Sequence, residues 1–313
     1  MMLLITGASG FIGGAVCLEA NSRGLNVRAV TRNRCDFPGI GVNVAVGAIN
    51  ESTDWGNAIQ GCDTVLHLAA RVHVIRDAAS DQLAEFRKVN VSATLNLARQ
   101  AALAGVRRFV FISSIGVNGN QTLVRPFNAQ DFEAPHSLYA ISKYEAEIAL
   151  RELAKETGME IVVIRPPLVY GPNAPGNFRT LVRWLSRGLP LPFGLVTTNR
   201  RSLVGLDNLV DLILTCAEHP KAANQTFLVS DGDDLSSADL LRRIGKAIGR
   251  PACLIPVPVS ILNIVFGMLG NRSISQSLLG SLQVDISKTC ELLDWKPPVP
   301  LDEGLLRASQ KRL

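Results

Sequence analysis

The sequence predicts an α/β protein with a doubly wound parallel sheet in its N-terminal half and a smaller, irregular domain at its C-terminal end. Short runs rich in β-branched residues alternate in the first half with longer helical patterns. The runs are almost continuously apolar, and strands of that kind belong to parallel sheets that helices cover on both faces. Beyond residue 170 the alternation stops and the chain becomes rich in proline.

Strands and helices are expected in the order in which these patterns occur. Helical patterns over residues 86–105 and 137–158 lie between the later apolar runs, and each closes near a glycine, which commonly terminates a helix. Repetition of strand and helix in this way predicts parallel strand neighbours. The predicted strands are residues 2–6, 26–31, 42–47, 63–70, 107–114 and 159–166.

The boundary between two domains is expected near residue 170. Residues 1–170 then form the sheet domain, and residues 171–313 form the smaller domain. The segment at residues 200–219 again has the pattern of a strand followed by a helix. It is therefore a candidate for packing back on the first domain.

Length and composition exclude membrane and secreted classes of protein. With 313 residues, of which 47% are apolar, the chain can bury a sizeable core. The longest apolar stretch, residues 255–270, contains prolines and glycines and is shorter than the ~20 residues of a membrane span. The N-terminus lacks the basic region of a signal peptide. We therefore expect a cytoplasmic protein without a membrane span.

Charge and cysteine content indicate which kinds of ligand the protein binds. The net charge of +5 arises from dispersed basic residues, which argues against nucleic acid and suits an anionic small molecule. Six cysteines lie far apart without a C-x-x-C pair, so neither a zinc site nor a disulfide framework is expected. The histidines have no metal-ligand spacing, and His67 is expected to be a packed side chain in a buried strand.

The first predicted strand runs into a cluster of glycines, TGASGFIGG at residues 6–14. Gly7, Gly10 and Gly13 form the pattern G-x-x-G-x-x-G between a predicted strand and a predicted helix. Glycines in this place allow a tight turn and a close approach of the backbone to a pyrophosphate, whose charge faces the helix N–H groups. The cluster predicts a Rossmann-type dinucleotide site.

The end of the second strand indicates which dinucleotide is bound. Sites for NAD commonly place an acidic residue there to hold the ribose hydroxyls of the adenosine. Here the strand ends in Thr31 and Arg32, a hydroxyl and a guanidinium that could bind a 2′-phosphate. We therefore expect NADP as the preferred cofactor, with NAD as the alternative.

A tyrosine and a lysine four residues apart supply candidate chemistry. Tyr139 and Lys143 share one face of a predicted helix, one turn apart. A free tyrosine has a pKa of about 10, so Tyr139 needs a nearby positive charge to act as an acid or base near neutrality. We expect Lys143 and the charge of the cofactor to lower that pKa. Ser113 and Ser114, at a strand end, offer a hydroxyl for the substrate oxygen.

These residues resemble the extended short-chain dehydrogenases/reductases, and within them the group of nucleotide-sugar epimerases and reductases. The resemblance extends from residue 2 to about residue 300 and implies catalytic roles for Ser114, Tyr139 and Lys143. Lys143 would also hold the nicotinamide ribose. The motifs that carry the resemblance are TGASGFIGG, HLAA (67–70), VNVSATLNL (89–97), FVFISSIGVNG (109–119), PHSLYAISK (135–143), RPPLVYGP (165–172), RRSLVGLDNLVDLI (200–213) and LQVDISKTCELLDWKP (282–297).

The resemblance also implies residues that bind the two ligands. Asn90 is expected mainly to support the active-site helix. A guanidinium is well suited to phosphate oxygens, which fits an arginine near the diphosphate of the substrate. The implied cofactor contacts are the glycine cluster with Phe11 and Ile12, together with Leu68, Ala69 and Ala70, and the implied contacts to the substrate are Ser114, Asn177 and Arg201.

Departures from the pattern narrow the reaction. Dehydratases of this group carry an Asp-Glu pair where this chain has Ile115 and Gly116, so elimination of water is not expected. The 3,5-epimerising reductases use a cysteine and a histidine where this chain has Ile115 and Asn173. An aspartate that usually contacts adenine is replaced by Ala48, which leaves that contact in doubt.

Together with the resemblance, the sequence thus predicts an oxidoreductase that acts at C4 of a UDP-activated hexose or N-acetylhexosamine. We expect it to take part in surface-polysaccharide synthesis and to form a homodimer. A net reductase must exchange its cofactor, which the looser pocket around Thr31, Arg32 and Ala48 favours. The preferred reaction is therefore NADPH-dependent reduction of a UDP-4-keto-6-deoxy-N-acetylhexosamine. The alternative is a 4-epimerase of UDP-glucose or UDP-GlcNAc. A reductase of small carbonyl compounds and a non-catalytic dinucleotide sensor remain as further alternatives.

Overall fold

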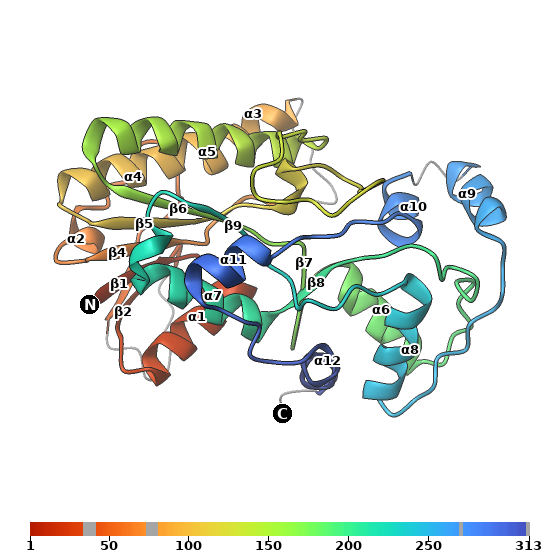
Figure 1. Cartoon of the computed structure of the whole chain (residues 1–313). Helices are drawn as coiled ribbons and strands as arrows, with labels where there is room; N and C mark the ends of the chain where they lie inside the picture. Colours follow the sequence, from red (N-terminus) through yellow and green to blue (C-terminus); the bar gives the residue numbers. More distant parts are fainter. Residues whose placement is uncertain (34–41, 73–80, 269–271, 311–313) are drawn as a thin grey trace.

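A parallel sheet forms the centre of the protein, for which we analysed a computed structural model that describes residues 1–33, 42–72, 81–268 and 272–310. In this described part of the chain the sheet has seven strands in the order β3-β2-β1-β4-β5-β6-β9, each parallel to its neighbour. The predicted doubly wound fold is confirmed (Figure 1). The strands are β1 (Met2–Thr6), β2 (Asn26–Thr31), β3 (Val42–Ala45), β4 (Thr64–His67), β5 (Arg108–Ile112), β6 (Glu160–Arg165) and β9 (Thr226–Leu228).

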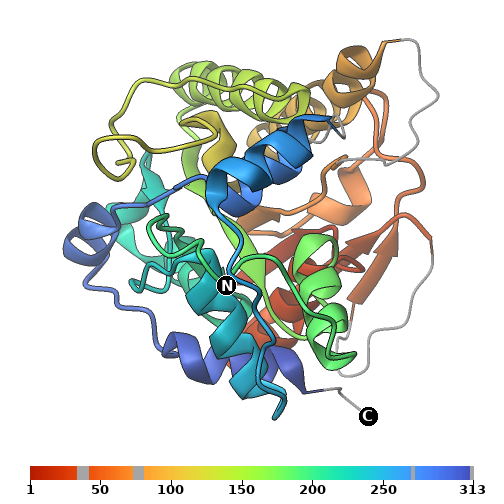
Figure 2. The ribbon, with the colours of Figure 1, turned by 90° about the vertical axis from the view of Figure 1, so that its right-hand side faces the viewer.

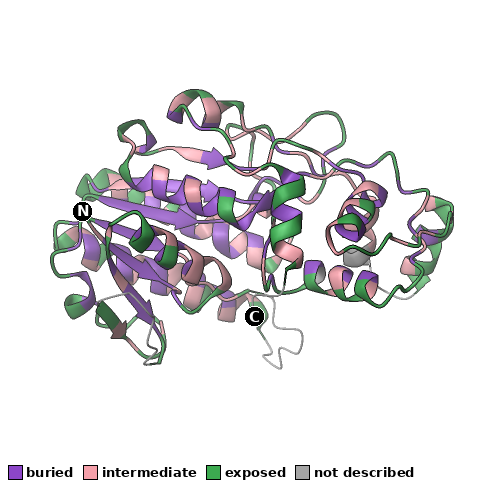
Figure 3. Ribbon diagram, turned by 90° about the horizontal axis from the view of Figure 1, so that it is seen from below, coloured by how far each residue is buried: buried purple, intermediate pink, exposed green. Residues whose placement is uncertain are grey.

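Helices cover both faces of this sheet, which explains why its strands are apolar along their whole length. Seen from below, the central strands are coloured as buried between the two helical layers (Figure 3). One layer contains α1 (Phe11–Ser22) and α7 (Leu206–Glu218), and α11 (Ser287–Leu293) adjoins it. The opposite layer contains α2 (Gly56–Ile59), α3 (Gln82–Arg87), α4 (Ala93–Leu103) and α5 (Leu138–Thr157), with a π-helical turn at Lys88–Ser92 between α3 and α4.

Helix α5 is defined at both ends by its sequence. Ser137 precedes it, and the Ser137 hydroxyl accepts a hydrogen bond from the N–H of Ala140 at 3.1 Å. Gly158 ends it with a φ of 73°, a left-handed conformation that glycine adopts without strain. The cap and the glycine fix the length of the helix, and with it the position of Tyr139 in its first turn.

A second group of elements encloses a core of its own. Among the described residues, β7 (Leu168–Tyr170) and β8 (Leu203–Gly205) pair in parallel as a two-stranded sheet. Most of the helices lie toward the right-hand end of the molecule in Figure 1, the end that faces the viewer in Figure 2, and they enclose buried side chains that include Phe178, Leu241 and Leu305. These helices are α6 (Asn177–Ser186), α8 (Ser237–Ala247), α9 (Val259–Met268), α10 (Arg272–Leu279) and α12 (Leu301–Ser309), and short 3-10 turns occur at Ile115–Val117 and Pro220–Ala222.

Two segments after residue 170 belong to the large sheet and its cover. Helix α7 lies against α1, and its Leu209 and Ile213 share a core with Val16. Strand β9 extends the sheet beyond β6. The boundary near residue 170 stays a prediction. None of the helices in the described ranges is long and apolar enough to cross a membrane.

Candidate active site

The turn between β1 and α1 is built for close backbone approach. Gly7 has a φ of +69°, and a Cβ on it would lie 2.8 Å from the backbone nitrogen of Ala69. A Cβ on Gly13 would lie 2.1 Å from the carbonyl oxygen of Gly7. Gly10 caps α1 without a side chain, and the first turn of the helix carries no acidic residue. Such a turn fits the diphosphate of a dinucleotide, because helix N–H groups can face it and no side chain intrudes.

The segment after β4 lies against the same turn. Leu68, Ala69 and Ala70 follow β4 directly, and each is partly exposed. The N–H of Ala69 donates to the hydroxyl of Thr6 at 3.3 Å, which ties this segment to the end of β1. The structure therefore brings the predicted cofactor residues from two strands together at one edge of the sheet.

At the end of β2, where the adenosine ribose is expected, the hydroxyl of Thr31 is hydrogen-bonded within the protein. Thr31 is buried, and its hydroxyl donates to the carbonyl oxygen of Asn33 at 2.6 Å. Arg32 is exposed. Residues 34–41, which follow, lie outside the described residues. The preference for NADP stays a prediction that rests on Arg32 more than on Thr31.

The serine and the tyrosine belong to segments that pack against each other. Ser114 follows β5, and its hydroxyl accepts a hydrogen bond from the N–H of Gly116 at 3.1 Å. A Cβ on Gly116 would lie 3.3 Å from the Cβ of Ala140, in the first turn of α5. Since Tyr139 precedes Ala140, the turn that carries Ser114 adjoins the turn that carries Tyr139. The edge of the ring of Phe86 packs on the Tyr139 ring, with centroids 6.2 Å apart.

Lys143 is buried one turn further along α5. Its ammonium donates to the carbonyl oxygen of Ile112 at 2.8 Å and lies 4.3 Å from the centroid of the Phe111 ring. Burial lowers the pKa of Lys143 to about 7, and the nearby carboxylate of Glu147 acts in the opposite direction. The side chain thus reaches the end of β5 from the helix.

Burial acts on the pKa of Tyr139 in the direction opposite to the one that catalysis needs. It raises this pKa to about 12, because removal of the phenol from water disfavours the phenolate. Lys143 is itself buried, and burial lowers its own pKa. The lowering of the Tyr139 pKa by Lys143 and the charge of the cofactor together stays a prediction.

Asn90 supports the helix, as the sequence indicated. It is buried in the π-helical turn, and its amide donates to the hydroxyl of Ser142 at 3.0 Å and to the carbonyl oxygen of Arg71 at 3.0 Å. The Ser142 hydroxyl in turn donates to the carbonyl oxygen of Tyr139 at 2.8 Å. His67 is likewise packed: its two ring nitrogens contact the hydroxyls of Thr6 and Thr94, and burial lowers its pKa to about 3.

The two residues predicted for the substrate diphosphate lie in the second group of elements. The guanidinium of Arg201 is partly buried and donates to the carbonyl oxygens of Gln276 at 3.4 Å and Gly280 at 3.2 Å. Gln276 and Gly280 also line a cavity of about 630 Å³. Asn177 begins α6, but its side chain lies outside the described residues. The geometry that is described therefore places Arg201 beside α10.

A cavity beside the glycine turn does not contain the candidate catalytic residues. It measures about 870 Å³ and extends from Gly10 and Phe11 along α1 and α7, with Asp207 and Arg307 on its wall. It touches the glycine turn from the side of these helices. Ser114, Tyr139 and Lys143 do not line it. The candidate active site therefore comprises the glycine turn after β1, the residues that follow β5 and the first turns of α5.

Sequence reasoning missed a buried ion pair behind these residues, formed by Glu147 and Arg165. The signal that could have revealed it is the spacing on α5. Glu147 follows Lys143 by four residues and therefore lies on the same face of the helix. An acidic residue on the buried face of an amphipathic helix requires a partner, which the sequence alone does not identify.

The dinucleotide turn, the parallel sheet and the serine, tyrosine and lysine define a nicotinamide-dependent enzyme of the extended short-chain dehydrogenase/reductase class. The chain belongs to the NAD dependent epimerase/dehydratase family, whose model matches residues 3–230.

Known proteins resemble this chain over nearly its whole length. It is 46% identical over 310 residues to a UDP-glucose 4-epimerase of Vibrio cholerae, which covers 98% of this chain and 94% of that protein. The fold matches a UDP-glucose 4-epimerase of Thermotoga maritima solved with UDP-glucose, with a TM-score of 0.77 and 24% identity over 99% of this chain and 97% of that one. It also matches a UDP-glucuronic acid 4-epimerase of Bacillus cereus solved with NAD, with a TM-score of 0.79 and 20% identity over 99% and 95% of the two chains.

Proposed function

We propose that the protein is a 4-epimerase of UDP-hexoses that interconverts UDP-glucose or UDP-GlcNAc with the sugar of opposite configuration at C4. The observation that carries this proposal is the 46% identity over 98% of the chain to the Vibrio cholerae UDP-glucose 4-epimerase. Reduction of a UDP-4-keto-6-deoxy sugar, which we preferred from the sequence, has no such support. The epimerase alternative therefore takes its place.

The roles proposed for the catalytic side chains follow from their chemistry. A nicotinamide dinucleotide held at the turn of Gly7, Gly10 and Gly13 would supply reversible hydride transfer at C4 of the sugar. Tyr139 takes the proton of the 4-hydroxyl and gives it back, as general base and then general acid. The hydroxyl of Ser114 hydrogen-bonds to the oxygen on C4. Lys143, in its charged form, favours the phenolate of Tyr139.

We propose the remaining site residues as ligand contacts. The turn of Gly7, Gly10 and Gly13 receives the cofactor diphosphate, and a side chain on Gly7 or Gly13 would collide with backbone atoms. Phe11, Ile12 and Lys143, together with Leu68, Ala69 and Ala70, complete the proposed cofactor contacts. Arg201 and Asn177 are proposed to bind the substrate diphosphate, which requires the guanidinium of Arg201 to exchange its backbone acceptors for phosphate oxygens.

The cofactor preference is tested at Arg32. We propose that this exposed guanidinium favours the 2′-phosphate of NADP, so Arg32→Asp should weaken NADP binding and leave NAD binding near the wild-type value. The measurement is a titration of wild type and variant with each dinucleotide. Equal affinities of the wild type for NAD and NADP, unchanged in the variant, would contradict the preference and leave NAD as the working cofactor.

The proposed reaction is tested by product analysis in three parallel incubations. Purified protein receives UDP-glucose, UDP-GlcNAc, or a UDP-4-keto-6-deoxy-N-acetylhexosamine with NADPH. Interconversion at C4 of either of the first two sugars, without net change of the cofactor, supports the epimerase. Stoichiometric NADPH oxidation in the third incubation, with no reaction in the first two, would restore the reductase.

A homodimer is also proposed, and light scattering of the purified protein tests it.

A further inference from the structure

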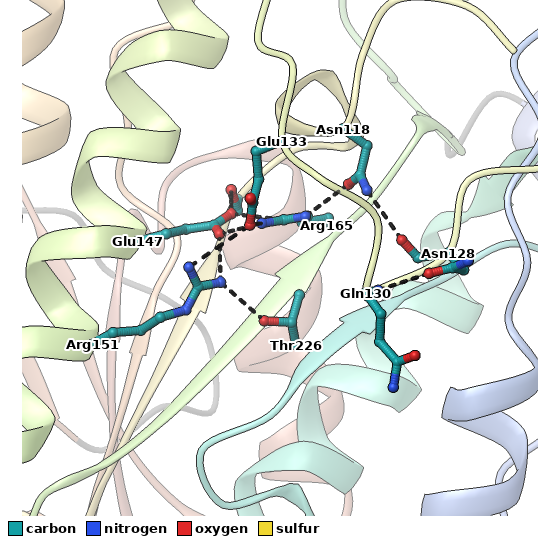
Figure 4. Close-up of polar contacts among 9 residues, drawn as sticks. Asn118, Asn128, Gln130, Glu133, Glu147, Arg151, Arg165 and Thr226 are labelled. Carbon is teal, nitrogen blue, oxygen red and sulfur yellow. Dashed lines mark hydrogen bonds and ion pairs between the residues drawn. The ribbon is translucent and has the colours of Figure 1, made fainter.

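A buried ion pair lies directly behind the candidate active site. Glu147 projects from α5 and Arg165 from the end of β6, and both side chains are almost completely buried. The pair is bidentate: the guanidinium of Arg165 donates to the two carboxylate oxygens of Glu147 at 2.6 Å and 3.0 Å. Figure 4 shows Arg165 between Glu147, Glu133 and Asn118.

Stability alone does not account for such a pair. Two charges lose their hydration when they are buried, and replacement by apolar side chains of similar volume is often neutral or stabilising. A bidentate arginine and carboxylate do, however, fix the relative orientation of the elements that carry them. The pair therefore fixes the orientation of α5 relative to the end of β6.

The carboxylate of Glu147 reaches the residue beside the candidate catalytic serine. Its Oε1 accepts a hydrogen bond from the hydroxyl of Ser113 at 2.5 Å. Ser113 is buried, and its N–H donates to the carbonyl oxygen of Ile164 at 2.8 Å. The hydroxyl and the backbone N–H of Ser113 are thus both hydrogen-bonded, and Ser114 is the next residue in the chain.

Arg165 extends the same network to the other end of the turn. Its Nη1 donates to the side-chain oxygen of Asn118 at 2.9 Å, and the Asn118 amide donates to the carbonyl oxygen of Asn128 at 3.1 Å. Its Nη2 also donates to Glu133 at 3.0 Å. The turn from residue 113 to residue 118 is consequently fastened at both ends to a pair that begins on α5.

We propose that Glu147 is a positioning residue for the reaction. Through Ser113 and Arg165, its carboxylate fixes the turn that carries Ser114 against the helix that carries Tyr139 and Lys143. This inference rests on the proposed catalytic roles of those three residues. Displacement of a reacting group by about 1 Å can cost on the order of a hundredfold in rate, so a loosened turn should lower turnover.

A fourth contact of Glu147 provides a matched control. The Nη2 of Arg151 donates to Oε2 of Glu147 at 2.9 Å and to the hydroxyl of Thr226 at 3.2 Å. Arg151 is partly exposed, and besides Thr226 on β9 it pairs with Glu133, with a nitrogen-to-oxygen distance of 4.0 Å (Figure 4). Its loss removes a partner of Glu147 and of Glu133 but leaves the contacts of Glu147 to Ser113 and Arg165 in place.

The test compares Ser113→Ala with Arg151→Gln, each assayed with the UDP-sugar that the wild type converts. Ser113→Ala removes only the hydroxyl that meets Glu147, and we expect kcat to fall about ten- to a hundredfold. The KM for the sugar and the Kd for the dinucleotide should stay near wild-type values. Arg151→Gln should retain the wild-type kcat. Glu147→Gln, if it folds, should lower kcat at least as much as Ser113→Ala.

The outcomes separate this inference from the proposed function. The positioning role would be overturned if Ser113→Ala had the kcat of the wild type. It would also be overturned if kcat fell only by the fraction of the variant that a thermal melt shows to be unfolded. An equal loss in Arg151→Gln would also overturn it, because the effect would then not depend on the serine turn. A Tyr139→Phe variant in the same series reports on the proposed function: if it remains active, the catalytic assignment fails, whatever Ser113→Ala does.

Discussion

Tyr139 must exchange a proton near neutral pH if it acts as the general acid and base. Burial raises its pKa to about 12, so at neutral pH the phenol retains its proton unless positive charge lies close by. The ammonium of Lys143 and positive charge on a bound dinucleotide would both act to lower this pKa.

Replacement of Tyr139 by phenylalanine tests its role as general acid and base. The variant loses the hydroxyl alone, so the fold and dinucleotide binding should survive, while kcat should fall by about 100- to 10,000-fold. Steady-state kinetics with a parallel cofactor titration makes the measurement. Near-normal turnover would remove Tyr139 from the mechanism and return the non-catalytic dinucleotide sensor to consideration.

Lys143 should set the alkaline side of the pH profile. Burial lowers its pKa to about 7, so the ammonium that favours the phenolate is progressively lost above that pH. The groups that face Lys143 are Tyr139 and Glu147 on α5, His67 on β4, and the ring of Phe111 and the carbonyl of Ile112 on β5. Of these, Glu147 acts to raise the pKa of Lys143.

Removal of the Glu147 charge should therefore narrow the pH range of activity. In Glu147→Gln the pKa of Lys143 falls further, so the alkaline decline of kcat should move to lower pH. Ser113→Ala keeps the carboxylate and should retain the wild-type position of that decline. A Glu147→Gln profile that coincides with the wild type after scaling would contradict the electrostatic part of this account.

At the scale of the element, the strand-to-helix turn is the part most tightly constrained by sequence. Two adjacent glycines in α1 differ in their surroundings: a Cβ on Gly13 would lie 2.1 Å from the oxygen of Gly7, whereas one on Gly14 would lie 3.3 Å from the oxygen of Ala8. Only the first of these distances is impossible without movement of the backbone. The glycine spacing read from the sequence therefore has a steric cause at Gly13.

The pair of variants Gly13→Ala and Gly14→Ala tests this cause. Gly13→Ala must push α1 from β1, and we expect a loss of stability of about 1–3 kcal/mol together with a large loss of dinucleotide affinity. Gly14→Ala needs only a small adjustment and should bind the dinucleotide nearly as well as the wild type. The measurements are thermal melts and cofactor titrations. Equal affinity in both variants would show that close packing at Gly13 does not shape the site.

At the scale of the whole molecule, the order of the strands explains where the site lies. The chain proceeds outward from β1 through β2 to β3, and then returns to place β4 on the other side of β1. A crevice forms at the carboxyl ends of strands where the direction of winding reverses, which is where ligands bind in open α/β sheets. The glycine turn after β1 and residues 68–70 after β4 meet at this position.

The sequence predicted this sheet well because its signals are local. Alternating apolar runs and helices identify six of the strands, and the spacing of Tyr139 and Lys143 follows from helix periodicity alone. It did not predict β9, a three-residue strand whose short apolar run resembles many others. Nor did it predict the pairing of Glu147 with Arg165 or the burial that acts on the pKa of Tyr139, because burial and partners depend on contacts between distant segments.

The central claim is that C4 of a UDP-hexose is oxidised and reduced again within one catalytic cycle. The most direct measurement follows deuterium placed on C4 of UDP-glucose through a reaction with the purified protein and its bound dinucleotide. We predict UDP-galactose that retains the deuterium on C4, with no net consumption of cofactor and no product from Tyr139→Phe. Absence of galactose product, or of the label from it, together with one NADPH oxidised for each 4-keto sugar reduced in a parallel incubation, would contradict the claim.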